Sequence, residues 1–325
     1  MTEHPADPRR LRSGGVLAPE VWLMTVTRDH APPARRPGVG GRLVAETRAV
    51  LRETRGRLRG HDLSLIAAGL TFYSGIAIVP SLLLAIRLAA LISSPDTIEG
   101  LGERIADLLP EPLGAPDAVR RLVEAGLELS WLGVLIAVFP ASLYGEGLRR
   151  AFLRFVDDEE TFIGWRGRLL VLPLLVVIPV LLYLLLLVSP TLSRLSSEGG
   201  AAATVTGVIV GFLSVWLVLA IPIAWTFRVV APGRPSWPAV IIGALGTSSF
   251  VSGFLQGFVL FLAIPVDLGA PFGGLVVIGA VVAVGFWLFI LHVVVLVGYV
   301  VTRSLSNRMA TNSLTSSVDG EGATQ

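Results

Sequence analysis

The stretch FGGLVVIGAVVAVGFWLFILHVVVLVGYVV, residues Phe272–Val301, contains no acidic or basic side chain apart from one histidine. A helix of ~20 residues, rising ~1.5 Å per residue, crosses the ~30 Å hydrocarbon core of a bilayer. This stretch is long enough to do so. On the surface of a soluble domain, a helix of this kind would expose a large apolar patch and favour aggregation. The stretch therefore predicts a membrane-spanning helix.

Five further apolar stretches precede this one, and the first two are the most polar. The first contains Arg87 and the second contains Glu146, whereas the other three carry no internal charge. The whole chain is 53% hydrophobic and 15% charged, with a mean hydropathy of +0.73. The predicted fold class is therefore all-α, a polytopic membrane bundle of six transmembrane helices. The five preceding stretches are Leu63–Ile92, Leu127–Leu148, Leu169–Val188, Ala201–Phe227 and Ala239–Ile264.

Arginine is concentrated in every second gap between the stretches. All 26 basic residues are arginine, because the chain has no lysine. Short loops rich in basic residues stay on the cytoplasmic side of a membrane, so both termini are predicted to be cytoplasmic. An arrangement without the weakly apolar second span would place arginine-rich gaps on both sides. The arginine-rich gaps contain Arg42–Arg59, Arg149, Arg150, Arg154, Arg166, Arg168, Arg228, Arg234, Arg303 and Arg308, and the opposite gaps contain Arg104, Arg120, Arg121 and Arg194.

The chain divides into tails, one surface helix and the spans. Residues 1–41, rich in Pro, Arg and Gly, are predicted to be a disordered cytoplasmic tail, and translation is hypothesised to start at Met24. Residues 42–60 predict a basic helix that lies on the inner membrane surface and attracts anionic lipid. The alternative is a solvated helix held by Glu–Arg pairs. Residues 61–303 form the six-helix domain, and residues 304–325 a second disordered cytoplasmic tail.

The gap between the first two spans is acidic and too long for a simple connector. Ile98–Leu109 and Ala118–Leu127 have helical periodicity and are separated by prolines. We expect two short amphipathic helices there, on the outer face of the membrane.

The first span carries four residues with a possible role in a polar cavity or gate. Asp62 suits a helix N-cap, which is a structural role. Tyr73 can hydrogen-bond across helices, and Pro80 removes a backbone bond and bends the helix. Arg87 either reaches the outer headgroups along the surface or faces the bundle as an anion site.

The second span is polar at its cytoplasmic end, where Tyr144, Glu146 and Arg149 complete the candidate cavity. Glu146 can pair with Arg149 or Arg150 at helical spacing. This pair is either an interfacial ion pair or a polar gate at the inner mouth. We therefore expect any working site to lie between the first two spans.

No pattern in the chain predicts catalysis. The absence of cysteine excludes disulfides and thiolate metal sites. The histidines, which are His4, His30, His61 and His292, have no metal-ligand spacing. His292 is interpreted as a hydrogen-bonding residue between helices. The protein is predicted to be no enzyme, with no catalytic residue, no metal and no cofactor.

Several segments resemble, in order, those of the YihY/BrkB family. This resemblance covers about residues 45–303 and implies a six-span inner-membrane protein of undefined molecular activity. The family commonly ends its last span with Gly-Ala-Glu, whereas this chain has Gly298-Tyr299-Val300, so a role that depends on that Glu would be absent. The similar segments are HDLSLIAAGLTFY at 61–73 with Pro80, Leu143–Phe152, Thr226–Pro232 with Trp237–Ala244, Phe272–Gly274 and Leu296–Gly298.

The expected function is transport or translocation of a lipid or an anionic solute in a bacterial inner membrane. The alternative is a membrane scaffold or envelope-homeostasis protein that transports nothing. The family has also carried a ribonuclease BN label, but the sequence has no clustered His/Asp metal site for phosphodiester hydrolysis. The expected partners are membrane lipids, with anionic lipid at the basic helix, and no nucleic acid.

Overall fold

The computed structural model describes residues 39–107, 114–156, 164–177, 180–181, 201–262, 264 and 267–322. The chain divides into two compact units, Met1–Ala45 and Glu46–Gln325. In the first unit the described residues form the first turns of helix α1 (Val39–Leu58), and the predicted tail before residue 39 lies outside the described residues. All contacts below lie within the second unit.

The described part of the chain is helical and contains no strand. Five helices are long and apolar enough to cross a membrane by length and composition. The third predicted span, Leu169–Val188, falls partly outside the described residues, and its described part belongs to a helix at 164–177. The five helices are α2 (Leu63–Ile92), α5 (Trp131–Leu153), α7 (Ala201–Trp225), which continues into the π-helical turn η2 (Thr226–Val230), α8 (Trp237–Leu262) and α9 (Val276–Gly322).

Polar caps set the start of the first two spans. Asp62 is the N-cap of α2, as predicted, and its carboxylate accepts a hydrogen bond from the Leu65 amide at 3.0 Å. The second span was predicted to begin at Leu127, but α5 begins at Trp131. The hydroxyl of Ser130 accepts from the Gly133 amide at 3.1 Å and caps the helix there.

Two short helices, α3 (Pro95–Ala106) and α4 (Ala115–Leu127), follow α2, where two helices were expected. They pack against each other and against α2. The contact is close because Gly102 has no side chain, and a Cβ there would lie 2.8 Å from a methyl carbon of Val123. A salt bridge of 3.0 Å between Arg120 and Glu103 also joins them. Their position relative to a membrane stays a prediction.

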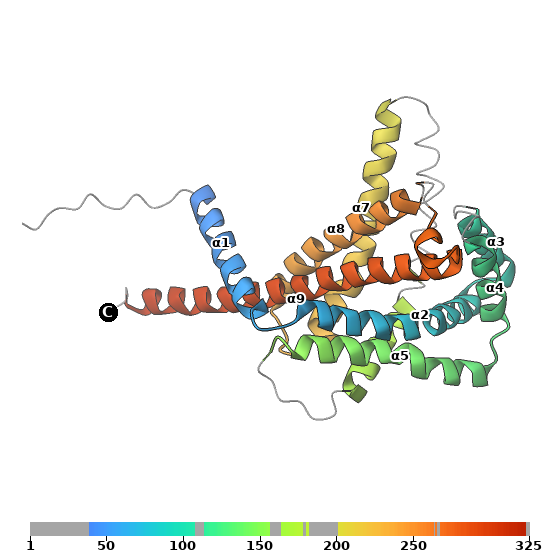
Figure 1. Ribbon diagram of the computed structural model, residues 1–325. Coiled ribbons are helices and arrows are strands. Elements are labelled where there is room, and N and C mark those ends of the chain that lie inside the picture. The colour runs from blue at the N-terminus through green and yellow to red at the C-terminus, as the bar shows by residue number, and fades with distance from the viewer. Residues whose placement is uncertain are drawn as a thin grey trace, which may run out of the picture. The chain divides into compact units, whose positions relative to one another are not determined.

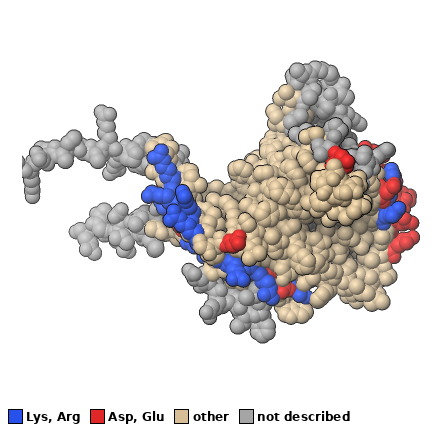
Figure 2. All heavy atoms as spheres, viewed as in Figure 1, with Lys and Arg blue, Asp and Glu red and all other residues tan. Residues whose placement is uncertain are grey.

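The long helices pack in the order α5, α2, α9, α8, α7 (Figure 1). The core lies where α5, η2 and α9 meet, and Phe152, Phe227 and Tyr299 are fully buried there with ring centroids 4.4–6.2 Å apart. Figure 2 shows arginine along α1 and at the end of the bundle where α2 begins, and acidic side chains mixed with arginine over α3 and α4. The acidic gap of the sequence thus lies at the end of the bundle formed by α3 and α4.

Helix α9 is longer than the predicted last span. It continues to Gly322, so most of the segment predicted as a disordered tail is helical in the structure. Its extension contacts α1, where Arg308 and Glu46 form a salt bridge of 2.9 Å and the Thr54 hydroxyl donates to Ser304 at 3.5 Å. These contacts depend on the tertiary fold, which the polar composition of the segment does not reveal.

Candidate functional site

The connection between α7 and α8 has an unusual backbone. Helix α7 ends in the π-helical turn η2, which the Ala231 amide closes by donating to the Thr226 carbonyl at 2.8 Å. Gly233 and Arg234 then adopt positive φ angles of 77° and 36°. Residues 230–236, from the last residue of η2 to the start of α8, are called the α7–α8 loop below. π-Helical turns occur frequently at functional sites, because they displace side chains from the regular helical positions.

Side chains from two other helices hold this loop by its carbonyl oxygens. Arg149 on α5 donates to the Val230 carbonyl at 2.5 Å. From α9, the Tyr299 hydroxyl donates to the Pro232 carbonyl at 2.7 Å, and Arg303 donates to the Gly233 carbonyl at 2.6 Å. A Cβ at Gly233 would overlap the Arg303 guanidinium, so this close approach needs glycine as well as the positive φ.

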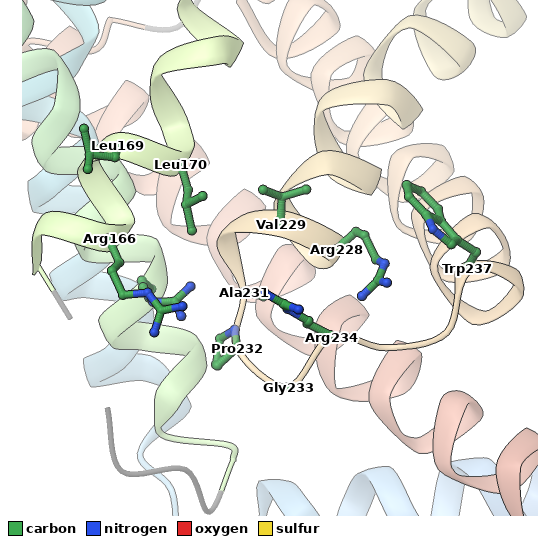
Figure 3. A pocket seen from close by; sticks show the side chains of 11 residues that line it. Arg166, Leu169, Leu170, Arg228, Val229, Ala231, Pro232, Gly233, Arg234 and Trp237 are labelled. Atoms are coloured by element: carbon green, nitrogen blue, oxygen red, sulfur yellow. The ribbon is translucent and has the colours of Figure 1, made fainter. Parts of the chain in front are cut away.

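A cavity of about 440 Å³ lies between this loop and the helix at 164–177. Four of its lining residues are arginines, contributed by α5, the helix at 164–177, η2 and the loop. Figure 3 shows Arg166 across the cavity from Arg228 and Arg234. The Arg228 guanidinium also lies over the Trp237 ring, 5.4 Å from its centroid. The lining residues are Arg149, Arg166, Leu169, Leu170, Arg228, Val229, Ala231, Pro232, Gly233, Arg234 and Trp237.

The chemistry of this lining suits an anion. A guanidinium presents several N–H donors in a planar fork that matches the oxygens of a carboxylate or phosphate. Leu169, Leu170, Val229 and Trp237 form the apolar part of the lining. The described lining residues include no carboxylate.

A buried carboxylate lies close to the cavity on α5. Glu146 is 8% exposed and forms salt bridges with Arg150 at 2.8 Å and with Arg168 at 2.7 Å. The predicted spacing to Arg150 is therefore confirmed, and Arg168 is a partner that the spacing did not indicate. Arg168 also lies over the Phe139 ring, 4.7 Å from its centroid. These contacts tie α5 to the helix at 164–177.

These two helices cross at a pair of glycines. A Cβ on Gly145 would overlap the Gly167 carbonyl, and one on Gly167 would clash with the backbone of Gly145 and Glu146. The backbones approach closely only because neither residue has a side chain. This crossing positions Arg166, one residue earlier, at the edge of the arginine-lined cavity.

Tyr144 takes part in a polar junction of three helices. His292 on α9 is buried, with one ring nitrogen 3.0 Å from the Thr71 hydroxyl of α2 and the other 3.1 Å from the Tyr144 hydroxyl of α5. The Thr71 hydroxyl also donates to the Ala67 carbonyl at 2.9 Å. His292 thus bonds between helices, as the sequence interpretation held, and its partners come from α2 and α5.

The remaining candidate residues lie elsewhere. Asp62 and Tyr73 line a second cavity, between α2 and α5. Pro80 lies inside α2, lining neither of these cavities. Arg87 donates to the Leu127 carbonyl at 3.0 Å, at the end of α4, and lies over the Trp131 ring. Arg87 thus contacts the ends of α4 and α5, on the side of the bundle away from the arginine-lined cavity, and both alternatives for its role stay predictions.

Of the four arginines of the arginine-lined cavity, only Arg149 was named as a candidate from the sequence, and Arg166, Arg228 and Arg234 were missed. These three arginines were used only to predict which loops face the cytoplasm. Because both of their loops were predicted to lie on the same side of the membrane, the sequence did indicate that they could lie close together. Among the described residues, no three His, Cys, Asp or Glu side chains form a group that could hold a metal ion.

Five helices of membrane-spanning length, packed around an apolar core and carrying arginine at one end, define a helical membrane protein. The family model described as Virulence factor BrkB matches residues 54–320. The chain therefore belongs to the BrkB virulence factor family, in agreement with the resemblance found in the sequence. Comparisons with curated proteins and with solved structures found no match.

Proposed function

We propose that this protein is a multi-pass protein of the bacterial cytoplasmic membrane that binds and moves an anionic lipid or solute. The arginine-lined cavity is the binding site. It opens at the end of the bundle that carries most of the arginine, and by the positive-inside rule that end faces the cytoplasm. The proposed activity is binding and movement without covalent chemistry.

The observation that carries the proposal is the convergence of four arginines on one cavity of about 440 Å³. The cavity also exceeds the size of a phosphate or carboxylate group, so part of a larger anion can enter. Three hydrogen bonds to the carbonyls of Val230, Pro232 and Gly233 fix, without an anion, the backbone that carries Arg228 and Arg234. A site organised before binding avoids the entropy cost of ordering it.

The test measures flux in proteoliposomes. Scrambling of a fluorescent phosphatidylglycerol reports a lipid substrate, and uptake of radiolabelled phosphate reports a solute. The double variant Arg228→Gln/Arg234→Gln removes two guanidiniums that hold no loop carbonyl. Hydrogen bonds to charged groups contribute ~1.5–3 kcal/mol each, so the double variant should reduce flux of the transported species about 100-fold or more.

The matched control is Arg121→Gln, which removes an exposed arginine of α4 at the other end of the bundle. Its flux should equal that of the wild type. Two results would contradict the proposal. In one, wild-type vesicles move neither probe faster than empty vesicles. In the other, the control loses as much flux as the double variant.

A membrane scaffold is the second candidate function, and one observation favours it. Helix α9 extends to Gly322, past the segment predicted to cross the membrane, and its contacts with α1 hold a basic helix beside it. Such a pair of helices can bind anionic lipid and a partner protein together. Stable partners recovered by crosslinking, from a protein that moves neither probe, would support this function.

A further inference from the structure

A second cavity, of about 370 Å³, lies between α2 and α5 and has a polar end and an apolar end. The polar end lies at the start of α2, with His61 and Asp62, and includes Arg150 of α5 and its C-cap Arg154. The apolar end follows α2 from Leu65 onward. This order of polar and apolar groups resembles the order in a membrane lipid.

The polar end can bind a phosphate group. Arg150 lies in the last turn of α5, and Arg154, four residues later, is the C-cap with a backbone that is still helical, so both lie on the same face. Both are exposed. Arg150 contacts Glu146 through two of its nitrogens, at 2.8 and 2.9 Å, and a guanidinium has further donors for a second acceptor.

The apolar end can hold a hydrocarbon chain. Leu65 is 70% exposed. Gly69 lines the groove and leaves space in it, because an added Cβ there would meet no atom within 4 Å. The groove is closed at Tyr73, because a Cβ at Gly147 of α5 would lie only 2.7 Å from the Tyr73 ring. The Tyr73 hydroxyl makes no hydrogen bond to the described residues.

The length of the groove matches one leaflet. From Asp62 to Tyr73 the helix rises about 16 Å at ~1.5 Å per residue. Half of a ~30 Å hydrocarbon core is about 15 Å. A chain whose headgroup lies at the start of α2 would therefore end near Tyr73.

We propose that this groove binds one glycerophospholipid, with its phosphate at Arg150 and Arg154 and an acyl chain along Gly69 as far as Tyr73. This site goes beyond the proposed function, since it needs no transport and shares no residue with the arginine-lined cavity. It recognises the whole amphiphile, both head and chain.

Native mass spectrometry of the full chain, delipidated in detergent and titrated with dioleoyl phosphatidylglycerol, tests this proposal. Gly69→Leu places a side chain in the space for the acyl chain and should lower the affinity for the first bound lipid about tenfold. Its matched control is Gly75→Leu, on the same helix, where a Cβ also meets nothing within 4 Å but which does not line the groove. The control should bind within twofold of the wild type.

Arg154→Gln is the second variant, and its exposed position keeps the test valid if Gly69→Leu does not fold. It should also weaken the adduct about tenfold, whereas Arg121→Gln should not. Wild-type binding by Arg154→Gln would overturn the proposal, as would full displacement of the lipid by equimolar glycerol phosphate, which has the head but no chain. Wild-type vesicles that move neither probe, from a protein that still forms the lipid adduct, would contradict the proposed transport alone.

Discussion

The buried carboxylate of Glu146 gives the sharpest test of the packing around the cavity. Glu146→Gln keeps the size of the side chain but removes the charge that two arginines contact. The side chain of Arg168 is only 18% exposed, and breaking a buried ion pair costs ~3–5 kcal/mol. The side chain of Arg150 is 54% exposed, and its pair contributes only ~0–1 kcal/mol. Because glutamine still accepts a hydrogen bond, we expect a loss of about 2–4 kcal/mol.

The free energy of unfolding can be measured by titration with sodium dodecyl sulfate in mixed micelles. Glu99→Gln, which changes an exposed carboxylate of α3, is the matched control and should change it by less than ~0.5 kcal/mol. The double variant Glu146→Gln/Arg168→Gln should lose less than the sum of the two single variants, because the second change removes the unpaired charge. Two results would refute the reasoning, namely a single variant as stable as the wild type, or strictly additive losses.

Two further predictions concern close packing and a buried hydrogen bond. Gly145→Ala should lower the thermal unfolding midpoint, at a cost of ~1–3 kcal/mol or more, because the new methyl group overlaps the Gly167 carbonyl. Gly211→Ala, in open space on α7, should not lower it, and equal midpoints for the two variants would contradict the prediction. Tyr299→Phe leaves a loop carbonyl without its donor and should cost ~1–3 kcal/mol in the same detergent titration. Tyr73→Phe should cost less, and the reverse order would argue against this role of the hydroxyl.

The sequence was sufficient for the class of fold because charge-free stretches of this length have few stable environments other than a bilayer. The bounds of α2 and its cap at Asp62 also followed from the sequence. The start of α5 did not follow from the sequence. The apolar pattern alone placed it at Leu127, whereas the Ser130 hydroxyl caps the helix and makes Trp131 its first residue. The helical extension of α9 was missed because its stability comes in part from contacts such as that of Arg308 with α1.

The candidate site was harder to predict because its key partners are backbone carbonyls. Arg149 was one of two partners considered for Glu146 within the same helix, and its donation to the Val230 carbonyl at the end of η2 was not foreseen. An acceptor of this kind has no signature in the sequence, since every residue has a carbonyl. Tyr144 was recognised as polar, but its partner His292 lies 148 positions away along the chain. Only the packing of the helices brings the two residues together.

The α7–α8 loop is anchored through its backbone, so the charge of the cavity can change independently of the loop's path. Its three anchors are all carbonyl oxygens, so the path of the loop does not depend on the side chains of Arg228 and Arg234. Replacing these two side chains would change the charge of the cavity while leaving its walls in place. These two positions are therefore the natural ones at which to engineer a different charge in the cavity without rebuilding the backbone around it.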